Sequence, residues 1–506
     1  MPHNRPNPLS ETRMSTAPPP PGTHTFLWHD YETFGSDARR DRPAQFAAIR
    51  TDAALQELGA PLMLHCQPSR DYLPDPEACL ITGITPQMCM VKGSPEAAFA
   101  NRIHAAFAEP GTIGVGYNSI RFDDEFTRFL FWRNLIDPYG REWQNECGRW
   151  DLLDVVRATW ALRPEGIEWP RNGDGKPSFK LEHLSAANGL VHEAAHDALS
   201  DVRATIALAR LIREKQPRLF DFCFAFHRKE RVAAEIGLPC TPREARPFIH
   251  ISGMFPVERG CMAIMWPLAT HPTNRNELIA WDLAHDPAEL ASLDVATLRE
   301  RIFTRVADLP EGVSRLPIKT VHLNKSPVVI GNLKVLTPAV RERWGIDLEQ
   351  QFAHAATARD LPDMSAIWPD VFRRPESSEA VDVEQDLYGG FLSNADRRRL
   401  DQLRTLPPAA LAGARIGFDD ARLEELVFRW RARNWPETLD EDGQARWEAL
   451  RHARLIEGQG GARTLAQLQE RLDILVDDAM EREDQRAEAI LNALAEWADY
   501  VTADLG

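Results

Sequence analysis

The order of strand-like and helical segments between residues 25 and 213 most constrains how this chain folds. Three short apolar runs, separated by polar connections that contain Gly or Pro, predict a β-meander over 25–28, 44–49 and 62–64. The later segments follow the order helix, strand, helix, helix, helix: 95–107, 112–117, 124–135, 152–162 and 197–213. This order predicts an α/β domain, a mixed sheet covered by helices.

Changes in composition divide the chain into four predicted segments. Residues 1–22 contain seven prolines and are predicted to be a disordered lead-in. The α/β domain is expected over 23–216, because Pro217 stops its last helical pattern. Residues 217–370 alternate short apolar runs with turn residues, which indicates a small β-rich domain with helical inserts. Residues 371–506 show helical periodicity and are predicted to form a helical C-terminal domain.

The net charge is −16, which excludes a simple basic protein that coats nucleic acid. One stretch, 314–345, is nevertheless basic and contains a single acid, Glu342. This basic strip fits either a solvated surface or a surface that binds phosphates. Its basic residues are Arg315, Lys319, Lys325, Lys334, Arg341 and Arg343.

The cysteine and hydropathy patterns indicate the cellular compartment of the protein. Seven scattered cysteines without a C-x-x-C pair argue against a disulfide framework or a zinc site and fit a reducing cytoplasm. The chain lacks an apolar run of about 18 residues, and residues 1–22 lack the apolar core of a signal peptide. We therefore expect a cytoplasmic protein without a membrane span.

The most specific chemical signal is the pair Asp30 and Glu32 in an apolar strand that reads FLWHDYET. Side chains two residues apart on a strand share a face, so these carboxylates project together. Directing two carboxylates the same way from an apolar strand is costly unless a cation such as Mg²⁺ neutralises them. By itself the pair also fits two solvated acids on an edge strand.

Two further segments add acids and a base. Asp123 follows a buried strand where a helix begins, a position that also fits a helix N-cap, as does Asp124. If Asp197 caps the helix that follows it, His196 belongs to the preceding loop and Asp201 to the first turn. Alone, a loop histidine is usually an ordinary surface residue.

Taken together, these segments indicate metal-dependent phosphodiester hydrolysis. Four carboxylates can hold two divalent ions about 4 Å apart, and such a pair stabilises both the attacking and the leaving oxygen of a phosphoryl transfer. A neutral histidine can deprotonate the attacking water.

These residues resemble the DEDDh exonucleases, and longer blocks resemble one family among them, the bacterial exodeoxyribonucleases I. The blocks include WHDYETFG, GYNSIRFDDEFTRFLFWRN, HDALSDVRATIALA, HISGMF and HPTNRN. The resemblance runs from Thr23 to the C-terminus. It implies a 3′→5′ single-strand DNA exonuclease of repair and recombination, with a ribonuclease-H-like sheet. An SH3-like middle domain and the helical C-terminal domain would complete a positively lined DNA channel.

The resemblance also implies roles for individual residues. Asp30, Glu32, Asp123 and Asp201 would hold two Mg²⁺ ions, with Mn²⁺ as an alternative, and His196 would be the general base. The implied substrate contacts are Glu32, Arg128, Tyr139, Trp143, Arg157 and Lys180. Lys180 departs from the family, which has arginine there; lysine keeps the charge and loses bidentate phosphate geometry.

The implied partners are single-stranded DNA and the acidic C-terminal tail of single-strand-binding protein. Arg163 matches one basic residue of the tail-binding surface, and the basic strip is a reasonable neighbour. We expect a monomer. Two alternatives stay open: an exonuclease that trims RNA, which the two extra domains disfavour, and a non-catalytic nucleic-acid-binding scaffold, which the five occupied catalytic positions disfavour.

Overall fold

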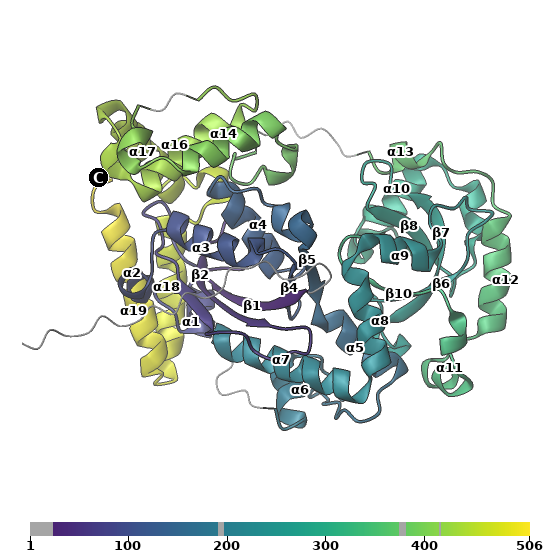
Figure 1. The fold of residues 1–506 in the computed structure, drawn as a ribbon. Coiled ribbons are helices and arrows are strands. Elements are labelled where there is room, and N and C mark those ends of the chain that lie inside the picture. The colour runs from purple at the N-terminus through teal and green to yellow at the C-terminus, as the bar shows by residue number, and fades with distance from the viewer. Residues whose placement is uncertain (1–23, 191–196, 374–380, 414–415, 506) are drawn as a thin grey trace, which may run out of the picture.

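The structure is a computed structural model that describes residues 24–190, 197–373, 381–413 and 416–505. Its first sheet has the strand order β3-β2-β1-β4-β5, with β1 at the centre (Figure 1). β1 pairs antiparallel with β2 and parallel with β4, so the predicted mixed sheet is confirmed. The strands are β1 Thr25–Thr33, β2 Pro43–Thr51, β3 Leu62–His65, β4 Thr112–Gly116 and β5 Gly148–Asp151.

Two strands differ from the prediction. β1 continues beyond Trp28 to Thr33, because its pairing with β2 persists through the polar residues: Asp30 lies opposite Ala47 and Glu32 opposite Gln45. β5 was not predicted, since its sequence GRWD lacks an apolar run. The longer β1 places both carboxylates inside the central strand.

Helices cover both faces of this sheet. On one face, Phe26 and Trp28 of β1 share a buried cluster with Val202 and Ile206 of α7. On the other face, Tyr31 packs with side chains of α3 and α4. The helices of this part are α1 Pro76–Thr82, α2 Pro86–Lys92, α3 Glu96–Ala108, α4 Asp123–Arg133, α5 Leu152–Leu162, α6 Leu181–Ala187 and α7 Ala198–Lys215.

The middle of the chain forms a second sheet, antiparallel throughout, in the order β10-β6-β7-β8-β9. The predicted β-rich character is therefore confirmed. The strands are β6 Phe248–Ile251, β7 Met262–Thr270, β8 Glu277–Asp282, β9 Ile318–His322 and β10 Val328–Ile330. The α-helices around it are α8 Pro217–Phe224, α9 Lys229–Ile236, α10 Val295–Phe303, α11 Pro338–Trp344, α12 Leu348–Arg359 and α13 Trp368–Val371.

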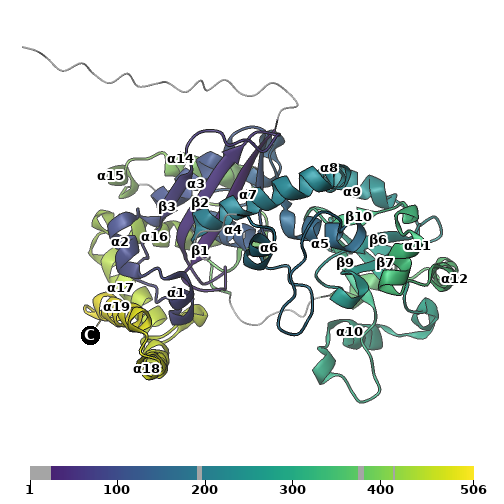
Figure 2. The same cartoon turned by 90° about the horizontal axis from the view of Figure 1, so that it is seen from below.

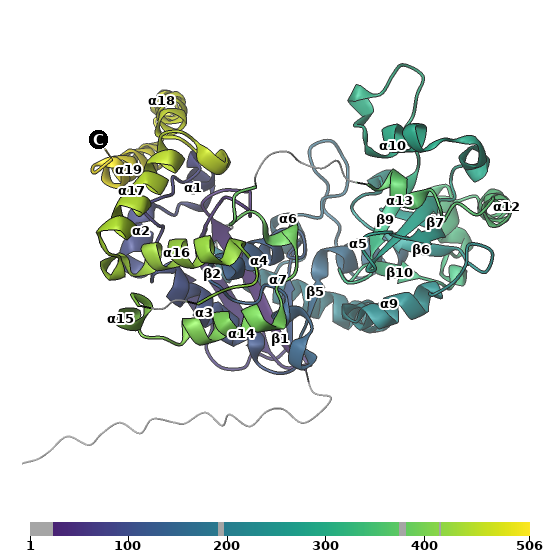
Figure 3. The same ribbon diagram turned by 90° about the horizontal axis from the view of Figure 1, so that it is seen from above.

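The C-terminal part is helical, as predicted. Its last two helices lie beside α1 and α2, at the end of the molecule away from the second sheet (Figures 2 and 3). Its α-helices are α14 Asn394–Arg404, α15 Pro408–Leu411, α16 Arg422–Asn434, α17 Glu441–Leu455, α18 Leu465–Glu481 and α19 Gln485–Thr502.

Buried ion pairs fix the C-terminal helices to the first sheet's domain. The carboxylate of Asp71 lies 2.7 Å from the guanidinium of Arg433 and 2.8 Å from that of Arg454. Glu384 binds the same two arginines, at 2.5 and 3.1 Å, and also Arg42 at 3.0 Å. Although burial opposes ionisation, these arginines lower the pKa of both carboxyls. The two parts are therefore joined by a charged core as well as by apolar packing.

In the part of the chain that the structure describes, none of the helices is long and apolar enough to cross a membrane. The domain boundaries stay predictions. The boundary proposed at 216 falls at the C-cap of α7, and the one proposed at 370 falls inside α13.

Candidate active site

The central strand and α7 bring three of the predicted acids together. Asp30 and Glu32 project from the face of β1 against which α7 packs, since Phe26 and Trp28 of the same face contact that helix. The side chain of Asp197 accepts a hydrogen bond from the amide of Ser200 and caps α7. Asp201 therefore lies in the first turn, as the sequence predicts.

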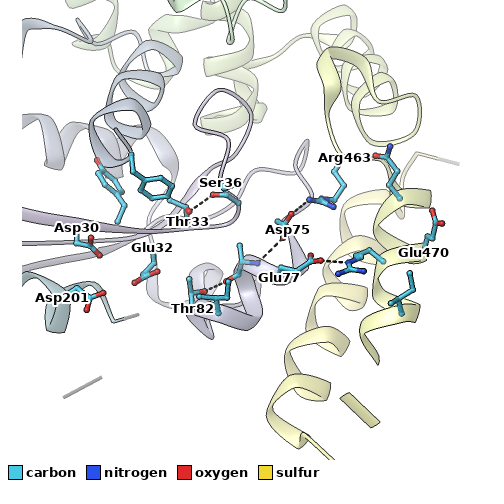
Figure 4. A pocket seen from close by; sticks show the side chains of 18 residues that line it. Asp30, Glu32, Thr33, Ser36, Asp75, Glu77, Thr82, Asp201, Arg463 and Glu470 are labelled. Carbon is cyan, nitrogen blue, oxygen red and sulfur yellow. Dashed lines mark hydrogen bonds and ion pairs between the residues drawn. The ribbon is translucent and has the colours of Figure 1, made fainter. Parts of the chain in front are cut away.

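Carboxylate oxygens of Asp30, Glu32 and Asp201 all lie within 4.8 Å of one another (Figure 4). Burial, followed by the charges of Asp123, Glu32 and Asp201, raises the pKa of Asp30 well above its usual range. Burial and the charges of Asp201 and Asp197 raise the pKa of Glu32 to about 8. These carboxylates repel one another, and a divalent cation with oxygen ligands would relieve that repulsion. The donor set therefore fits Mg²⁺.

The fourth predicted acid, Asp123, lies beside this group and is held by the backbone. Its Oδ1 atom accepts a 3.0 Å hydrogen bond from the amide of Tyr31, between the two acids of β1. The N-cap of α4 is Phe122, so the alternative interpretation of Asp123 as the N-cap of this helix is wrong. Burial and the charge of Asp124 raise the pKa of Asp123.

Asp124 is not a cap either. Its carboxylate is buried between two arginines, with Arg141 at 2.5 Å and Arg149 at 3.2 Å. Although burial opposes ionisation, these guanidinium groups lower the pKa of Asp124. No local sequence pattern marks Arg141 or Arg149, because their partner Asp124 lies on another element. His196, the predicted base, lies outside the described residues.

The three clustered acids line one side of a cavity of about 830 Å³, within the size range of ligand sites. The opposite side is formed by α1 and by α18 of the C-terminal part (Figure 4). Two ion pairs join these helices near their N-terminal ends. Arg463, which precedes the N-cap of α18, pairs with Asp75, the N-cap of α1, and Arg471 of α18 pairs with Glu77 of α1 at 2.5 Å. This wall was missed in the sequence, since each pair joins residues nearly 400 positions apart.

The predicted substrate contacts differ in how accessible they are. Trp143 is 63% exposed, so its ring is free to stack on a base. Arg128 is only 6% exposed, and its guanidinium is bound by Glu142 at 2.7 Å and Glu125 at 2.9 Å. The same guanidinium lies over the ring of Tyr139, 5.3 Å from its centre. In this structure the guanidinium of Arg128 is therefore paired with two carboxylates and presents little surface to a substrate.

The remaining predicted contacts lie on α5 and near α6. Arg157 is partly buried and pairs with Asp154 at 2.5 Å. Lys180, the residue before α6, is exposed, and its ammonium lies 3.5 Å from Glu182. These cations are available to phosphates to different degrees, with Lys180 the more accessible.

Arg163 immediately follows α5 and lies close to the end of the basic strip. The indole of Trp344 donates a 2.9 Å hydrogen bond to the carbonyl of Ala161, and the guanidinium of Arg343 lies over the ring of Trp160. The helix α11, which ends the strip, therefore packs against the end of α5.

Three family models match successive parts of the chain: Exonuclease over residues 27–209, Exonuclease I SH3-like domain over 227–374 and Exonuclease I C-terminal domain over 381–501. An exodeoxyribonuclease I of Escherichia coli K12 is 46% identical over 478 residues, which are 94% of this chain and 98% of the relative.

Solved structures resemble the whole molecule. The zinc-bound complex of Escherichia coli exonuclease I with single-stranded DNA has a TM-score of 0.88 at 44% identity, covering 95% of this chain and 99% of that one. A structure of SSB/exonuclease I with the inhibitor CFAM has a TM-score of 0.85 at 44% identity, covering 94% and 99%. With its sequence, its three family models and its architecture all matched, this chain belongs to the exodeoxyribonuclease I family.

Proposed function

We propose that this protein is a 3′→5′ exodeoxyribonuclease that degrades single-stranded DNA to 5′-mononucleotides in DNA repair and recombination. The observation that carries the proposal is the group of three carboxylates within 4.8 Å at the edge of a cavity large enough for a nucleotide. Membership of the exodeoxyribonuclease I family and the DNA complex of a relative support the same substrate.

Asp30, Glu32 and Asp201 would hold the divalent cations of this site, and Asp123 would be a further acid of the metal site. Bound cations supply Lewis-acid stabilisation of the attacking and leaving oxygens. We propose Mg²⁺ as the ion in the cell, with Mn²⁺ as a substitute, because all the donors are carboxylate oxygens. The zinc found in a relative supports a divalent site and leaves the choice of ion to experiment.

The chain's own residues contribute position and proton transfer. The amide of Tyr31 holds the carboxylate of Asp123 beside Asp30. His196 takes the proton from the attacking water, a role that suits a neutral imidazole near neutral pH. Trp143 stacks on bases without reading their sequence, while Arg157 and Lys180 attract phosphates.

We further propose that the acidic tail of single-strand-binding protein docks at Arg163 and the neighbouring basic strip. The SSB/exonuclease I structure of a relative supports the partner, and the packing of α11 on α5 supports the location. We propose a cytoplasmic monomer; all seven cysteines are free thiols, which suits a reducing compartment.

Timed digestion of a 5′-labelled single strand and the matching duplex, with and without Mg²⁺, tests the proposal. We expect ladders that shorten from the 3′ end on the single strand, only with the metal, and release of deoxynucleoside monophosphates. Faster release of nucleotides from a matched RNA would favour the RNA-trimming alternative. Absence of any metal-dependent release would favour the non-catalytic scaffold.

A further inference from the structure

Of the four acids in the proposed metal site, Asp123 depends most on a turn for its position. Asp30 and Glu32 lie within strand β1, and Asp201 lies in the first turn of α7. Asp123 is the first residue of α4, and the chain reaches it from β4 through the turn residues 117–122. The contacts that hold this turn therefore also set the place of Asp123.

The turn is tight and includes a residue in the left-handed region. Asn118 has a φ of +64°, a conformation that costs free energy for residues with a side chain, although asparagine adopts it more readily than most. Gly116, which ends β4, lies so close to the turn that a Cβ atom there would stand 2.6 Å from the Cβ atom of Ser119. Contacts with the rest of the protein have to offset the cost of this conformation.

The carboxylate of Asp151 supplies such contacts. Asp151 ends β5 and lies opposite Gly116 in the parallel pair of β4 and β5 (Figure 1). Its Oδ1 atom accepts a 2.9 Å hydrogen bond from the amide of Asn118, and its Oδ2 atom accepts a 3.1 Å bond from the amide of Ile120. Oδ1 also accepts a 2.9 Å bond from the amide of Leu153 and so caps α5. One carboxylate thus binds three amides, two of them in the turn.

Hydrogen bonds continue from the turn into α4. The two turn amides that Asp151 binds lie on either side of Ser119, whose carbonyl accepts a 2.8 Å hydrogen bond from the amide of Asp124. Asp124 directly follows Asp123, whose own carboxylate is held by the amide of Tyr31. Asp123 is therefore held from two sides, by the turn that precedes it and by strand β1.

The charge of Asp151 suits this contact. An ionised carboxyl group offers only acceptors, so its two oxygens can bind three N–H groups at once. Burial and the charge of Asp154 raise the pKa of Asp151 to about 6, so the group is ionised at weakly alkaline pH. An asparagine in its place would have one oxygen and an NH₂ group, which repels a neighbouring N–H.

We propose that Asp151 is a positioning residue of the nuclease site, which sets the place of Asp123 through the amides of Asn118 and Ile120. The inference rests on the proposed function, in which Asp123 belongs to the metal site, and it gives the cap of α5 a second role. Groups that orient the acids of a metal site typically contribute about 10- to 100-fold in metal affinity or activity.

Asp151→Asn in the full-length protein tests this inference. The substitution keeps the shape of the side chain but turns an NH₂ group toward the amide of either Asn118 or Ile120. Titration of the metal-free protein with Mn²⁺, followed by electron paramagnetic resonance, gives the metal affinity. We expect that affinity to fall about 10- to 100-fold. On a single-stranded oligomer at a fixed Mg²⁺ concentration, kcat should fall while KM stays nearly unchanged, because Asp151 acts on the metal site and not on the strand.

A double-mutant cycle with Asp123→Asn separates positioning from a general loss of stability. If Asp151 acts through Asp123, adding Asp151→Asn to Asp123→Asn should weaken Mn²⁺ binding no further. Asp151→Ser is the second variant: a serine still caps α5 but has a single side-chain oxygen, so it should weaken Mn²⁺ binding as Asp151→Asn does.

Asp294→Asn is the matched control. Asp294 caps α10, beside the second sheet, through a 2.8 Å hydrogen bond from the amide of Thr297. It therefore loses the charge of a helix cap away from the carboxylates, and we expect both Mn²⁺ affinity and kcat to stay at their wild-type values.

An unchanged Mn²⁺ affinity in Asp151→Asn and Asp151→Ser would overturn the inference. A loss of equal size in the wild-type and Asp123→Asn backgrounds would also overturn it, because Asp151 would then act by another route. An unchanged Mn²⁺ affinity in Asp123→Asn alone would contradict the metal role of Asp123, and the inference with it. Failure of the proposed function as a whole would instead appear as no nucleotide release by the wild-type protein.

Discussion

The backbone amide of Tyr31 donates a hydrogen bond to Oδ1 of Asp123 across 3.0 Å. This bond joins the central strand to the first residue of α4, and it holds the acid of α4 near Asp30 of β1. After burial, the charge of Asp123 is the largest influence that raises the pKa of Asp30. The carboxylates are thus held together by strand pairing and backbone hydrogen bonds against their own repulsion.

Asp30→Ala should abolish nearly all hydrolysis while leaving the fold intact. The substitution removes a proposed metal ligand, and it also removes a buried carboxylate that the other acids repel. We expect less than about a tenth of wild-type turnover at saturating Mg²⁺ and an unchanged or raised Tm without metal. Asp30→Asn, which keeps the shape, should be similarly inactive. Turnover above that limit would contradict the metal assignment.

The metal-free protein should lose stability as the pH rises. Glu32 has a pKa of about 8 in the folded protein, against about 4.3 for a glutamate in an unfolded chain. Between these values the folded state binds more protons than the unfolded state. The contribution of Glu32 to stability is therefore complete below about pH 4 and is lost as the pH rises through about 8.

Thermal unfolding at two pH values checks the direction of this pH dependence of stability. We expect the Tm of the metal-free protein to fall between about pH 6 and about pH 8.5, and Mg²⁺ to restore it more strongly at the higher pH. In Glu32→Gln both effects should shrink, because the titrating carboxyl is gone. The same pH dependence of Tm in Glu32→Gln and wild type would show that the titration of another group causes it.

His196→Ala should retain binding of DNA and metal but lose about 10²- to 10⁴-fold in rate, the usual contribution of a general base. The fall in rate at low pH should weaken with it, since that limb reports protonation of the base. Rates and DNA affinity are measured on the same preparation. Loss of DNA binding would instead show that His196 has a structural role.

Glu384→Gln should destabilise the protein by about 3–5 kcal/mol, the cost of leaving buried cations without their partner. Glu384 is 2% exposed and binds arginines from both the first domain and the C-terminal domain. Because its folded pKa is lowered, its contribution is present above about pH 4.5 and is lost as the pH falls further.

Urea unfolding at neutral pH gives the free energy for this comparison. Asp478→Asn serves as the control, because Asp478 pairs with Arg482 on the exposed surface of α18, where such a pair contributes less than about 1 kcal/mol. Equal effects of the two substitutions would show that the buried ion pairs do not hold the domains together.

Local patterns in the sequence predicted the acids well. The two-residue spacing of Asp30 and Glu32 placed them on one face of a strand, and the capping residue Asp197 placed Asp201 in a first turn. The segment 152–162 was predicted with the bounds that α5 has. These features depend on neighbours in the sequence, so periodicity and capping chemistry suffice.

What was missed depends on contacts between distant segments. The N-cap interpretation of Asp123 failed because the amide of Tyr31, on another element, binds its carboxylate. No local sequence pattern marks Arg463 and Arg471 as cavity residues, since their role in the cavity wall comes from ion pairs with Asp75 and Glu77. Likewise, only the fold shows that Arg128 is buried between two carboxylates.

Trp143→Ala and Arg157→Ala should weaken DNA binding in different ways. Loss of the exposed Trp143 ring should cost about 1–3 kcal/mol, with little dependence on sequence or salt, because stacking is uncharged. Loss of the Arg157 cation should flatten the salt dependence, since each phosphate contact on a single strand contributes about 0.7 to the slope of log K against log salt. Titrations of one oligomer at several salt concentrations measure both quantities. Identical salt slopes in the two variants would refute the assignment of Arg157 to a phosphate, while the carboxylate site would stand on its own evidence.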